Sequence, residues 1–213
     1  MIETHTVRLE LEEEGFAQAK GIARDLLAGA VAAYPTETFY ALGAAACSKG
    51  AVDRVFELKR REASKPLSFI VSDIAMVREV ASPLPPAFLS LAGELWPGPL
   101  TLVLPAAAGL PDRLLGPGRS IALRIPPLVW LRALVRELGE PLTATSANRA
   151  GEKELSDPRD VRAQFEGRVD LIIDGGATPG GLPSTIVDLT GERPRILREG
   201  RIPAERIAAL LGG

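Results

Sequence analysis

Hydroxyl-bearing side chains gather where predicted strands end, and the first such segment follows Tyr34. Residues 34–43 read YPTETFYALG, in which Pro35 turns the chain and two threonines, Thr36 and Thr38, follow. Their hydroxyls and the free backbone groups of the turn could bind a small polar ligand. A Ser/Thr turn that only connects one element to the next explains the same residues. This segment alone leaves both interpretations open.

Positive charge is concentrated in the segment KRREASKP at residues 59–66. Lys59, Arg60, Arg61 and Lys65 place four cations within seven residues, at the predicted end of a helix. We expect Arg60 to project about 100° around that helix from Arg61. Such a cluster can bind an anion such as phosphate. Cations at the C-terminal end of a helix also interact favourably with its dipole, so a solvated helix end is the alternative.

Two further regions carry groups that could contact a ligand. Residues 143–148, TATSAN, run from a predicted strand into hydroxyls and an amide, which suit a phosphate or a base edge, and a strand end followed by an Asx turn is the alternative. Residues 180–188, GGLPSTIVD, contain glycines that permit close approach of a ligand to the backbone. They continue through a predicted hairpin turn at Gly191 into RILREG at 195–200. The hairpin does not explain the cation Arg198 after two apolar residues, for which a salt bridge is the alternative.

The sequence lacks the residue types that several catalytic classes require. It contains one histidine, His5, near an N-terminus that we expect to be mobile, and one cysteine, Cys47. These counts exclude Ser–His and Cys–His nucleophilic catalysis and a Cys/His zinc site. Neither GxxxxGK[ST] nor GxGxxG is present, so any phosphate site must be built differently.

Composition and charge indicate an ordinary globular domain. The 213 residues are 46% hydrophobic and 24% charged, with 25 Lys and Arg against 27 Asp and Glu. This balance excludes a collagen-like, coiled-coil or disordered chain and argues against a broadly basic nucleic-acid binder. The acidic N-terminus is unlike a signal peptide, and no apolar run reaches the roughly 20 residues of a membrane span. With a single cysteine, these features predict a cytoplasmic protein without membrane contact.

The elements that must position these groups alternate along the chain. Apolar periodicity predicts helices at residues 16–30, 51–61, 86–95, 128–138, 158–165 and 203–211, and a short helix capped by Asp73. Short apolar runs predict strands at residues 30–34, 67–72, 100–104, 120–125, 142–145, 169–173, 185–189 and 195–198. This alternation favours a single α/β (mixed α+β) domain over residues 1–213, with a twisted open sheet flanked by helices.

Taken in order, these segments resemble the YrdC-like family. The resemblance covers residues 16–202 and implies a basic concave cavity in the sheet. Its members include short, single-domain forms, which this chain resembles. The matching motifs are YPTETFYALG, the KxR of Lys59 and Arg61 followed by SKPL, WPGPLTLVLP at 96–105, IALRIP at 121–126, TSAN at 145–148, PSTIVDLT at 183–190 and LREG at 197–200.

The resemblance implies an enzyme that converts L-threonine, bicarbonate and ATP to threonylcarbamoyl-adenylate and pyrophosphate, toward N6-threonylcarbamoyladenosine in tRNA. The carbamate itself would attack the α-phosphate, with Lys59 and Arg61 as catalytic cations. Mg²⁺ would be held by the ATP phosphates and by no protein side chain. ATP contacts are implied for Lys59, Arg61, Lys65, Ser120, Ser146, Asn148, Ser156 and Arg198. Threonine contacts are implied for Thr36, Arg124, the backbone of Ala144, and Ser184.

Members of the family differ in activity, so alternatives stay open. YciO-like proteins share several of these motifs, and SFIV at residues 68–71 stands where some members carry a histidine. An RNA-binding or ribosome-associated module would hold double-stranded RNA by its shape and phosphates, but the low aromatic content of 5% argues against this as the main role. A synthase would make at most weak contact with tRNA or double-stranded RNA. A nucleotide-binding regulator without turnover is a third class. For the synthase, the resemblance implies that a separate transferase complex of the TsaD, TsaB and TsaE kind handles the tRNA.

Overall fold

A mixed sheet runs through the computed structural model, which describes residues 2–9, 15–60, 67–149 and 151–212. Its strands are β1 (His5–Arg8), β2 (Ala32–Pro35), β3 (Tyr40–Gly43), β4 (Ser68–Ile70), β5 (Leu100–Pro105), β6 (Ser120–Arg124), β7 (Leu142–Ser146), β8 (Leu171–Asp174), β9 (Thr185–Asp188) and β10 (Arg195–Arg198). The helices are α1 (Gly15–Leu27), α2 (Lys49–Lys59), α3 (Ile74–Val80), α4 (Pro86–Leu95), α5 (Val129–Leu138), α6 (Pro158–Phe165), α7 (Ala204–Leu210) and the 3-10 helix η1 (Asp112–Leu114). Within these described ranges, none of the helices combines the length and the apolar character that crossing a bilayer requires.

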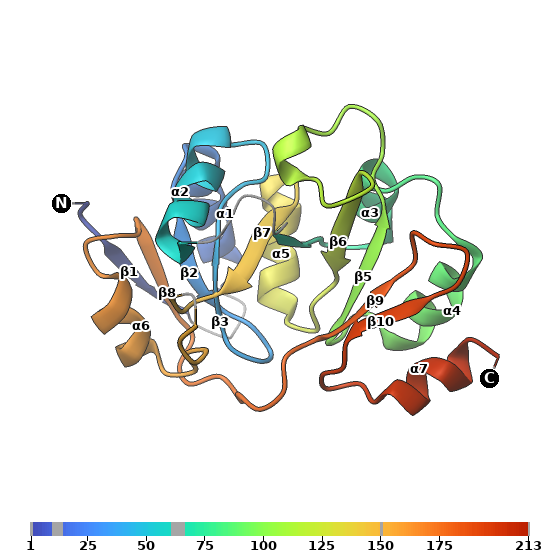
Figure 1. Ribbon diagram of the computed structural model, residues 1–213. Helices are drawn as coiled ribbons and strands as arrows, with labels where there is room; N and C mark the ends of the chain where they lie inside the picture. The colour runs from blue at the N-terminus through green and yellow to red at the C-terminus, as the bar shows by residue number, and fades with distance from the viewer. Residues whose placement is uncertain (1, 10–14, 61–66, 150, 213) are drawn as a thin grey trace.

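Strand β7 joins the two halves of the sheet. The strand order is β1-β8-β2-β3-β7-β4-β6-β5-β9-β10, and β7 pairs antiparallel with both β3 and β4. Figure 1 shows the first half of this order on the left, the second half on the right and β7 between them. Because both halves meet at β7, residues of this strand can contact groups that come from either half.

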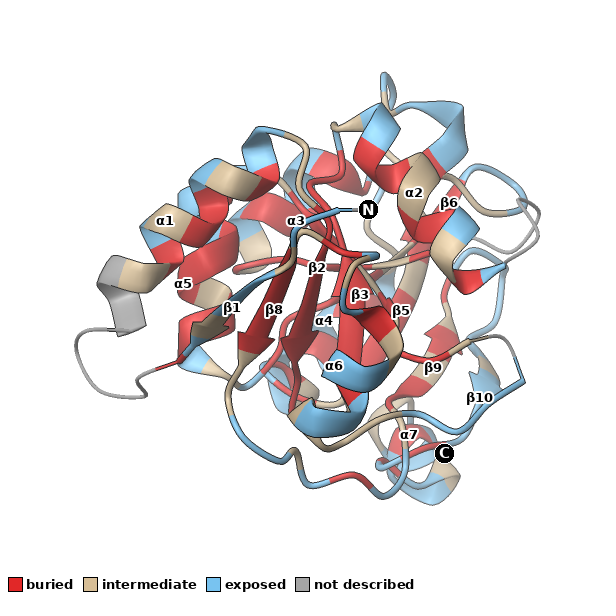
Figure 2. Ribbon diagram, turned by 90° about the vertical axis from the view of Figure 1, so that its left-hand side faces the viewer, coloured by how far each residue is buried: buried red, intermediate tan, exposed pale blue. Residues whose placement is uncertain are grey.

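Helices bury the central strands. Helices α1 and α5 pack side by side, as Figure 2 shows, and every residue of β2 and β3 is buried. Asp73 caps α3 as predicted, because its side chain accepts a hydrogen bond from the Met76 amide. The capped amide end holds α3 at the end of β4.

The predicted α/β sheet flanked by helices is confirmed, and each predicted helix and strand is present with small shifts at its ends. Two strands were missed. The expectation of a mobile terminus at His5 is wrong, because His5 pairs with Leu171 in the parallel β1–β8 ladder. The predicted helix 51–61 lies two residues too far along the chain, because α2 spans Lys49–Lys59 and Arg60 has a left-handed backbone with φ of 48°. Arg60 therefore does not continue the helix toward Arg61, which lies outside the described residues.

Gly43 permits the close approach of β3 to β7. A β-carbon at Gly43 would overlap the carbonyl oxygen of Thr143, and the same carbonyl accepts a 2.8 Å hydrogen bond from the Tyr34 hydroxyl. The Thr143 hydroxyl accepts another from the Ala44 amide at 2.8 Å. A side chain at Gly43 would therefore push apart the strands on which the site residues of β7 depend.

We expect Gly43→Ala to lower the free energy of unfolding by about 1–3 kcal/mol, the usual cost of overpacking a filled core. Gly50→Ala is the matched control, because Gly50 lies in α2 and a β-carbon there meets no atom within 4 Å. That substitution should stabilise the helix by about 0.5–1 kcal/mol. Urea denaturation of both variants measures the difference, and equal effects would contradict the proposed overlap.

Candidate functional site

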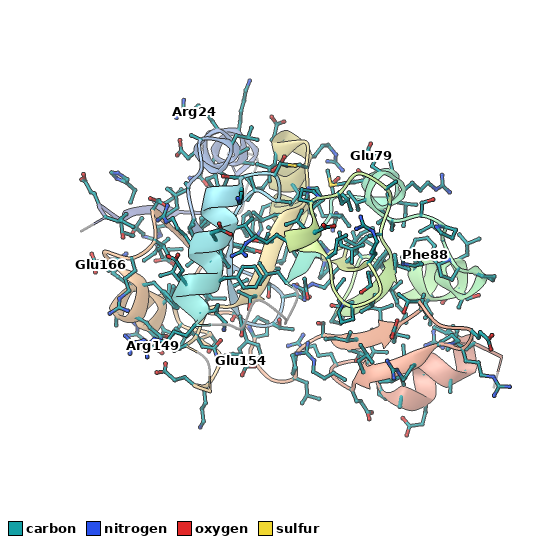
Figure 3. All side chains as sticks on the ribbon, turned by 45° about the horizontal axis from the view of Figure 1, so that its top comes forward. Arg24, Glu79, Phe88, Arg149, Glu154 and Glu166 are labelled. Carbon is teal, nitrogen blue, oxygen red and sulfur yellow. The ribbon has the colours of Figure 1, made fainter. Side chains whose placement is uncertain are left out.

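A cavity of about 190 Å³ lies against β7 at the junction of the two sheet halves. Figure 3 shows the labelled Glu154, one of its lining residues, between α6 and the β9–β10 hairpin. Both halves of the sheet contribute to the lining, which is rich in hydroxyl groups. The polar lining residues are Thr36, Thr38, Tyr40, Ser68, Thr101, Arg124, Thr145, Ser146, Glu154, Ser184 and Arg198.

Lys59 ties the end of α2 to the end of β7. Its ammonium donates to the carbonyl oxygens of Ser146 at 2.7 Å and Asn148 at 2.8 Å, and to Asn148 Oδ1 at 2.5 Å. The Ser146 hydroxyl also donates to Asn148 Oδ1, at 2.6 Å. The side chain of Lys59 is buried, so its positive charge lies in a setting where charge interactions are strong. This cluster fixes the three residues on one side of the cavity.

Arg124 stands on the opposite side, at the end of β6, and forms an ion pair with Glu37 in the β2–β3 turn. The distance from Arg124 NH1 to Glu37 Oε1 is 2.7 Å, and both side chains are only 9% exposed. Arg124 lines the cavity, whereas Glu37 lies behind it. The turn that carries Glu37 thus supports a cavity residue from a strand 87 residues away in the chain.

Arg198 and Ser184 form a third group, from β10 and the start of β9. Arg198 donates two hydrogen bonds to the Ser184 carbonyl, at 2.9 and 3.2 Å, and the Ser184 hydroxyl lies 3.0 Å from that of Thr101. A β-carbon at Gly200 would overlap the Pro183 carbonyl, so glycine lets the two chains meet here. Burial lowers the pKa of Arg198 below its usual value, while the charge of Glu154 partly opposes this shift and the charge of Arg124 adds to it. The salt bridge considered for Arg198 is not found among the described residues, because it contacts Ser184 instead.

The turn after β2 both closes on itself and lines the cavity. Thr36 Oγ1 donates to the Phe39 carbonyl at 2.7 Å and accepts from the Thr38 amide at 3.2 Å. Tyr40 also lines the cavity, and its hydroxyl donates to the Gly176 carbonyl at 2.8 Å. Burial raises the pKa of Tyr40 to about 12, so the phenol stays protonated. The same residues therefore form both a Ser/Thr turn and part of the cavity lining.

The structure brings six of the residues implied by the resemblance to one cavity: Thr36, Arg124, Ala144, Ser146, Ser184 and Arg198. Lys59 and Asn148 join them through Ser146. Ser120 and Ser156 do not line this cavity: the Ser120 hydroxyl donates to the Pro117 carbonyl, and the Ser156 carbonyl accepts from the Thr178 amide. Arg61 and Lys65 lie outside the described residues.

The sequence assigns a possible ligand contact to Thr38, which does line the cavity, but it gives no role to Glu37, Thr101 or Glu154. Glu37 stands inside the YPTET motif, which is the signal that could have drawn attention to it. Thr101 stands inside the WPGPLTLVLP motif, whereas nothing in the sequence marks Glu154, because its neighbours in the cavity are remote in the chain. With Arg124 and Arg198 against Glu154, the cavity lining is basic among the described residues. Such a cavity suits an anionic ligand with a planar carboxylate or a phosphate.

Comparison with known proteins gives concordant matches. A family model described as "Telomere recombination" and named for Sua5, YciO and YrdC matches residues 24–200. A threonylcarbamoyl-AMP synthase from Pyrococcus abyssi is 37% identical over 206 residues, which cover 97% of this chain and 60% of the relative. The chain thus spans about three fifths of the length of the first curated relatives that it matches.

Solved structures agree with this comparison. The crystal structure of P. abyssi Sua5 complexed with L-threonine superposes with a TM-score of 0.89 at 35% identity, over 100% of this chain and 61% of that chain. Escherichia coli YciO superposes with a TM-score of 0.85 at 28% identity, over 97% of this chain and 100% of that chain. Both likenesses extend across the sheet and the cavity described above.

Proposed function

This chain belongs to the Sua5, YciO and YrdC family, and from that premise and the geometry of the cavity we propose that it is a threonylcarbamoyl-AMP synthase. One observation carries the proposal: Arg124, whose guanidinium could bind a carboxylate, lines the same cavity as Ser146, to whose carbonyl oxygen Lys59 donates a hydrogen bond. An amino acid and a nucleotide can therefore lie side by side across β7. The name of the relatives with which the chain aligns supports the same activity.

The proposed reaction needs no nucleophile from the protein. The threonine amine adds to the carbon of bicarbonate, and loss of water leaves a carbamate. A carbamate oxygen then attacks the α-phosphorus of ATP, the bond from that phosphorus to the bridging oxygen breaks, and pyrophosphate leaves with the electron pair. The protein positions the substrates and stabilises the negative charge that develops on the phosphates. This transfer makes the enzyme a nucleotidyltransferase.

The cavity divides between the two substrates. Arg124, Ser184, Thr36 and the backbone of Ala144 would bind threonine, since the planar guanidinium fits a carboxylate. Lys59, Ser146, Asn148 and Arg198 would contact ATP from the other side, together with Arg61 and Lys65. Mg²⁺ would arrive with ATP and be held by its phosphates. Ser120 and Ser156, which do not line the cavity, have no part in this proposal.

Release of pyrophosphate from ATP tests the proposal. The purified protein with Mg²⁺ should release pyrophosphate only when both L-threonine and bicarbonate are present. Release that is indifferent to threonine would favour a different activity of the family, and ATP binding without release would favour a regulator. Saturable binding of tRNA with a steep salt dependence, and no ATP site, would favour an RNA-binding module.

We propose that the product passes to a separate transferase complex, of the TsaD, TsaB and TsaE kind, in the cytoplasm. The near-neutral charge of the chain, −2 at pH 7, supports this division of labour because it leaves little attraction for the tRNA backbone. Contact with tRNA would be weak. Tight, sequence-selective binding of tRNA by this chain alone would contradict it.

We expect Arg61→Ala to weaken the use of ATP by a few kcal/mol, as when one partner of a desolvated charge pair is lost. Arg61→Lys should recover only part of the lost ATP use, because an ammonium group lacks the planar set of donors that a guanidinium offers to a phosphate. Arg60→Ala is the control: Arg60 is exposed at the end of α2, so its removal should change little. Steady-state kinetics, with circular dichroism to verify folding, compares the variants. Equal effects at the two positions would place the phosphate site elsewhere.

A further inference from the structure

The buried carboxylate of Glu37 is not satisfied by the ion pair that it forms. Oxygen Oε1 accepts from Arg124 NH1 at 2.7 Å, but Oε2 is buried and has no hydrogen-bond partner among the described residues. An arginine and a carboxylate can form two parallel hydrogen bonds, and a buried oxygen without a donor costs stability. The pair is therefore not arranged for maximal stability. A role in the cavity explains its geometry better.

The single hydrogen bond leaves one edge of the guanidinium unused. Arg124 NH1 is engaged by Glu37, and the described residues provide no hydrogen bond to Nε or NH2. These two groups form the side edge of the guanidinium, whose parallel N–H bonds match the two oxygens of a carboxylate. Arg124 lines the cavity and Glu37 does not, so Glu37 holds the side of the guanidinium that is turned away from a ligand.

We propose that Glu37 is a positioning residue that orients Arg124 for the carboxylate of the amino-acid substrate. The inference rests on the proposed function, in which Arg124 binds threonine. The hydrogen bond from NH1 to Glu37 holds the Arg124 side chain in one rotamer. The edge formed by Nε and NH2 is then already oriented toward the carboxylate of the substrate. Because Glu37 also neutralises a buried cation, the guanidinium of Arg124 can stay ordered when no substrate is present. Glu37 itself touches neither substrate.

Two variants of Glu37 test the role, one by removing its charge and the other by changing the position of that charge. Glu37→Gln keeps the length and one acceptor but removes the charge, while Glu37→Asp keeps the charge but draws it back by one methylene. In both we expect the KM for L-threonine to rise by about tenfold or more, while the KM for ATP stays within about twofold. Calorimetric titration should show the same loss of L-threonine affinity without any turnover.

A substrate analogue provides a measurement that a purely structural role would not move. L-Threoninol carries a hydroxymethyl group in place of the carboxylate, so it cannot use the Arg124 edge. We expect the wild-type protein to bind L-threonine in clear preference to L-threoninol, and both Glu37 variants to lose most of this preference. Asp112→Asn is the matched control for Glu37→Gln, since it removes the charge of a carboxylate whose oxygen lies at the same 2.7 Å from NH1 of Arg119, outside the cavity.

The outcomes are distinct. Unchanged threonine affinity, or an unchanged preference over threoninol, in a folded Glu37 variant would overturn the positioning role. Equal rises in the KM for ATP and for threonine would overturn it as well, since they indicate a general disturbance of the fold. If Glu37→Gln does not fold, Glu37→Asp decides. Wild-type protein that binds threonine without releasing pyrophosphate would refute the proposed function, while the binding measurements still decide the role of Glu37.

Discussion

Substitution of Lys59 by methionine is expected to lower kcat/KM for ATP by about 10²- to 10³-fold, the loss seen when a charge-stabilising donor leaves an active site. Lys59 donates to the carbonyls of Ser146 and Asn148 and to Asn148 Oδ1. Methionine fills a similar volume but donates nothing, so these groups lose their shared partner and β7 loses its link to α2. Steady-state measurement of pyrophosphate release, with ATP varied, gives the effect.

The matched control for this variant is Lys49→Met, which makes the same replacement at an exposed position in the first turn of the same helix. It should leave the kinetics and the free energy of unfolding close to wild type. If Lys59→Met had wild-type kinetics in a folded protein, Lys59 would have no role at the nucleotide site. Its cluster with Ser146 and Asn148 would then be structural only.

Replacement of Arg124 by leucine is expected to abolish the saturable use of L-threonine and to destabilise the fold. Removing one partner of a buried ion pair leaves an uncompensated charge, here on Glu37, and costs about 3–5 kcal/mol. The variant should therefore unfold at a lower urea concentration than the wild-type protein.

A second substitution checks the cause of that instability. In the Arg124→Leu background, Glu37→Gln removes the buried charge and should restore much of the free energy of unfolding, without restoring the use of threonine. Urea denaturation measures the stabilities, and the pyrophosphate assay measures activity. If the double variant were no more stable than Arg124→Leu alone, the buried charge would not be the cause of the loss.

The fold was predictable where local signals mark the ends of elements. Proline in the first turn and an apolar stripe place α4 at Pro86–Leu95 and α6 at Pro158–Phe165 with the bounds that the structure has. The missed strand β1 is mostly exposed, so it lacks the alternation that marks a half-buried strand. The other missed strand, β3, begins at Tyr40, directly after the turn that follows β2, so no separate apolar run marks it in the sequence.

The candidate site was predictable only in its parts. A resemblance of motifs indicates Lys59, Ser146 and Asn148, but the sequence does not show that a lysine in a helix bonds to both residues at a strand end. The pairing of Glu37 with Arg124 could not be predicted, because it depends on the strand order across the sheet. Sequence spacing determines which side of an element a residue occupies, whereas tertiary packing determines its partner.

The position of β8 has a consequence for how the chain is made. Strand β8 lies between β1 and β2, and Leu171 is the register partner of both His5 and Ala32. Contacts between such distant residues form late, because the entropy of closing the long loop must be overcome first. On the ribosome, β1 and β2 therefore emerge long before the strand that separates them. Until β8 is synthesised, both present unpaired edges, and chaperones or rapid synthesis would protect the nascent chain from pairing with its neighbours.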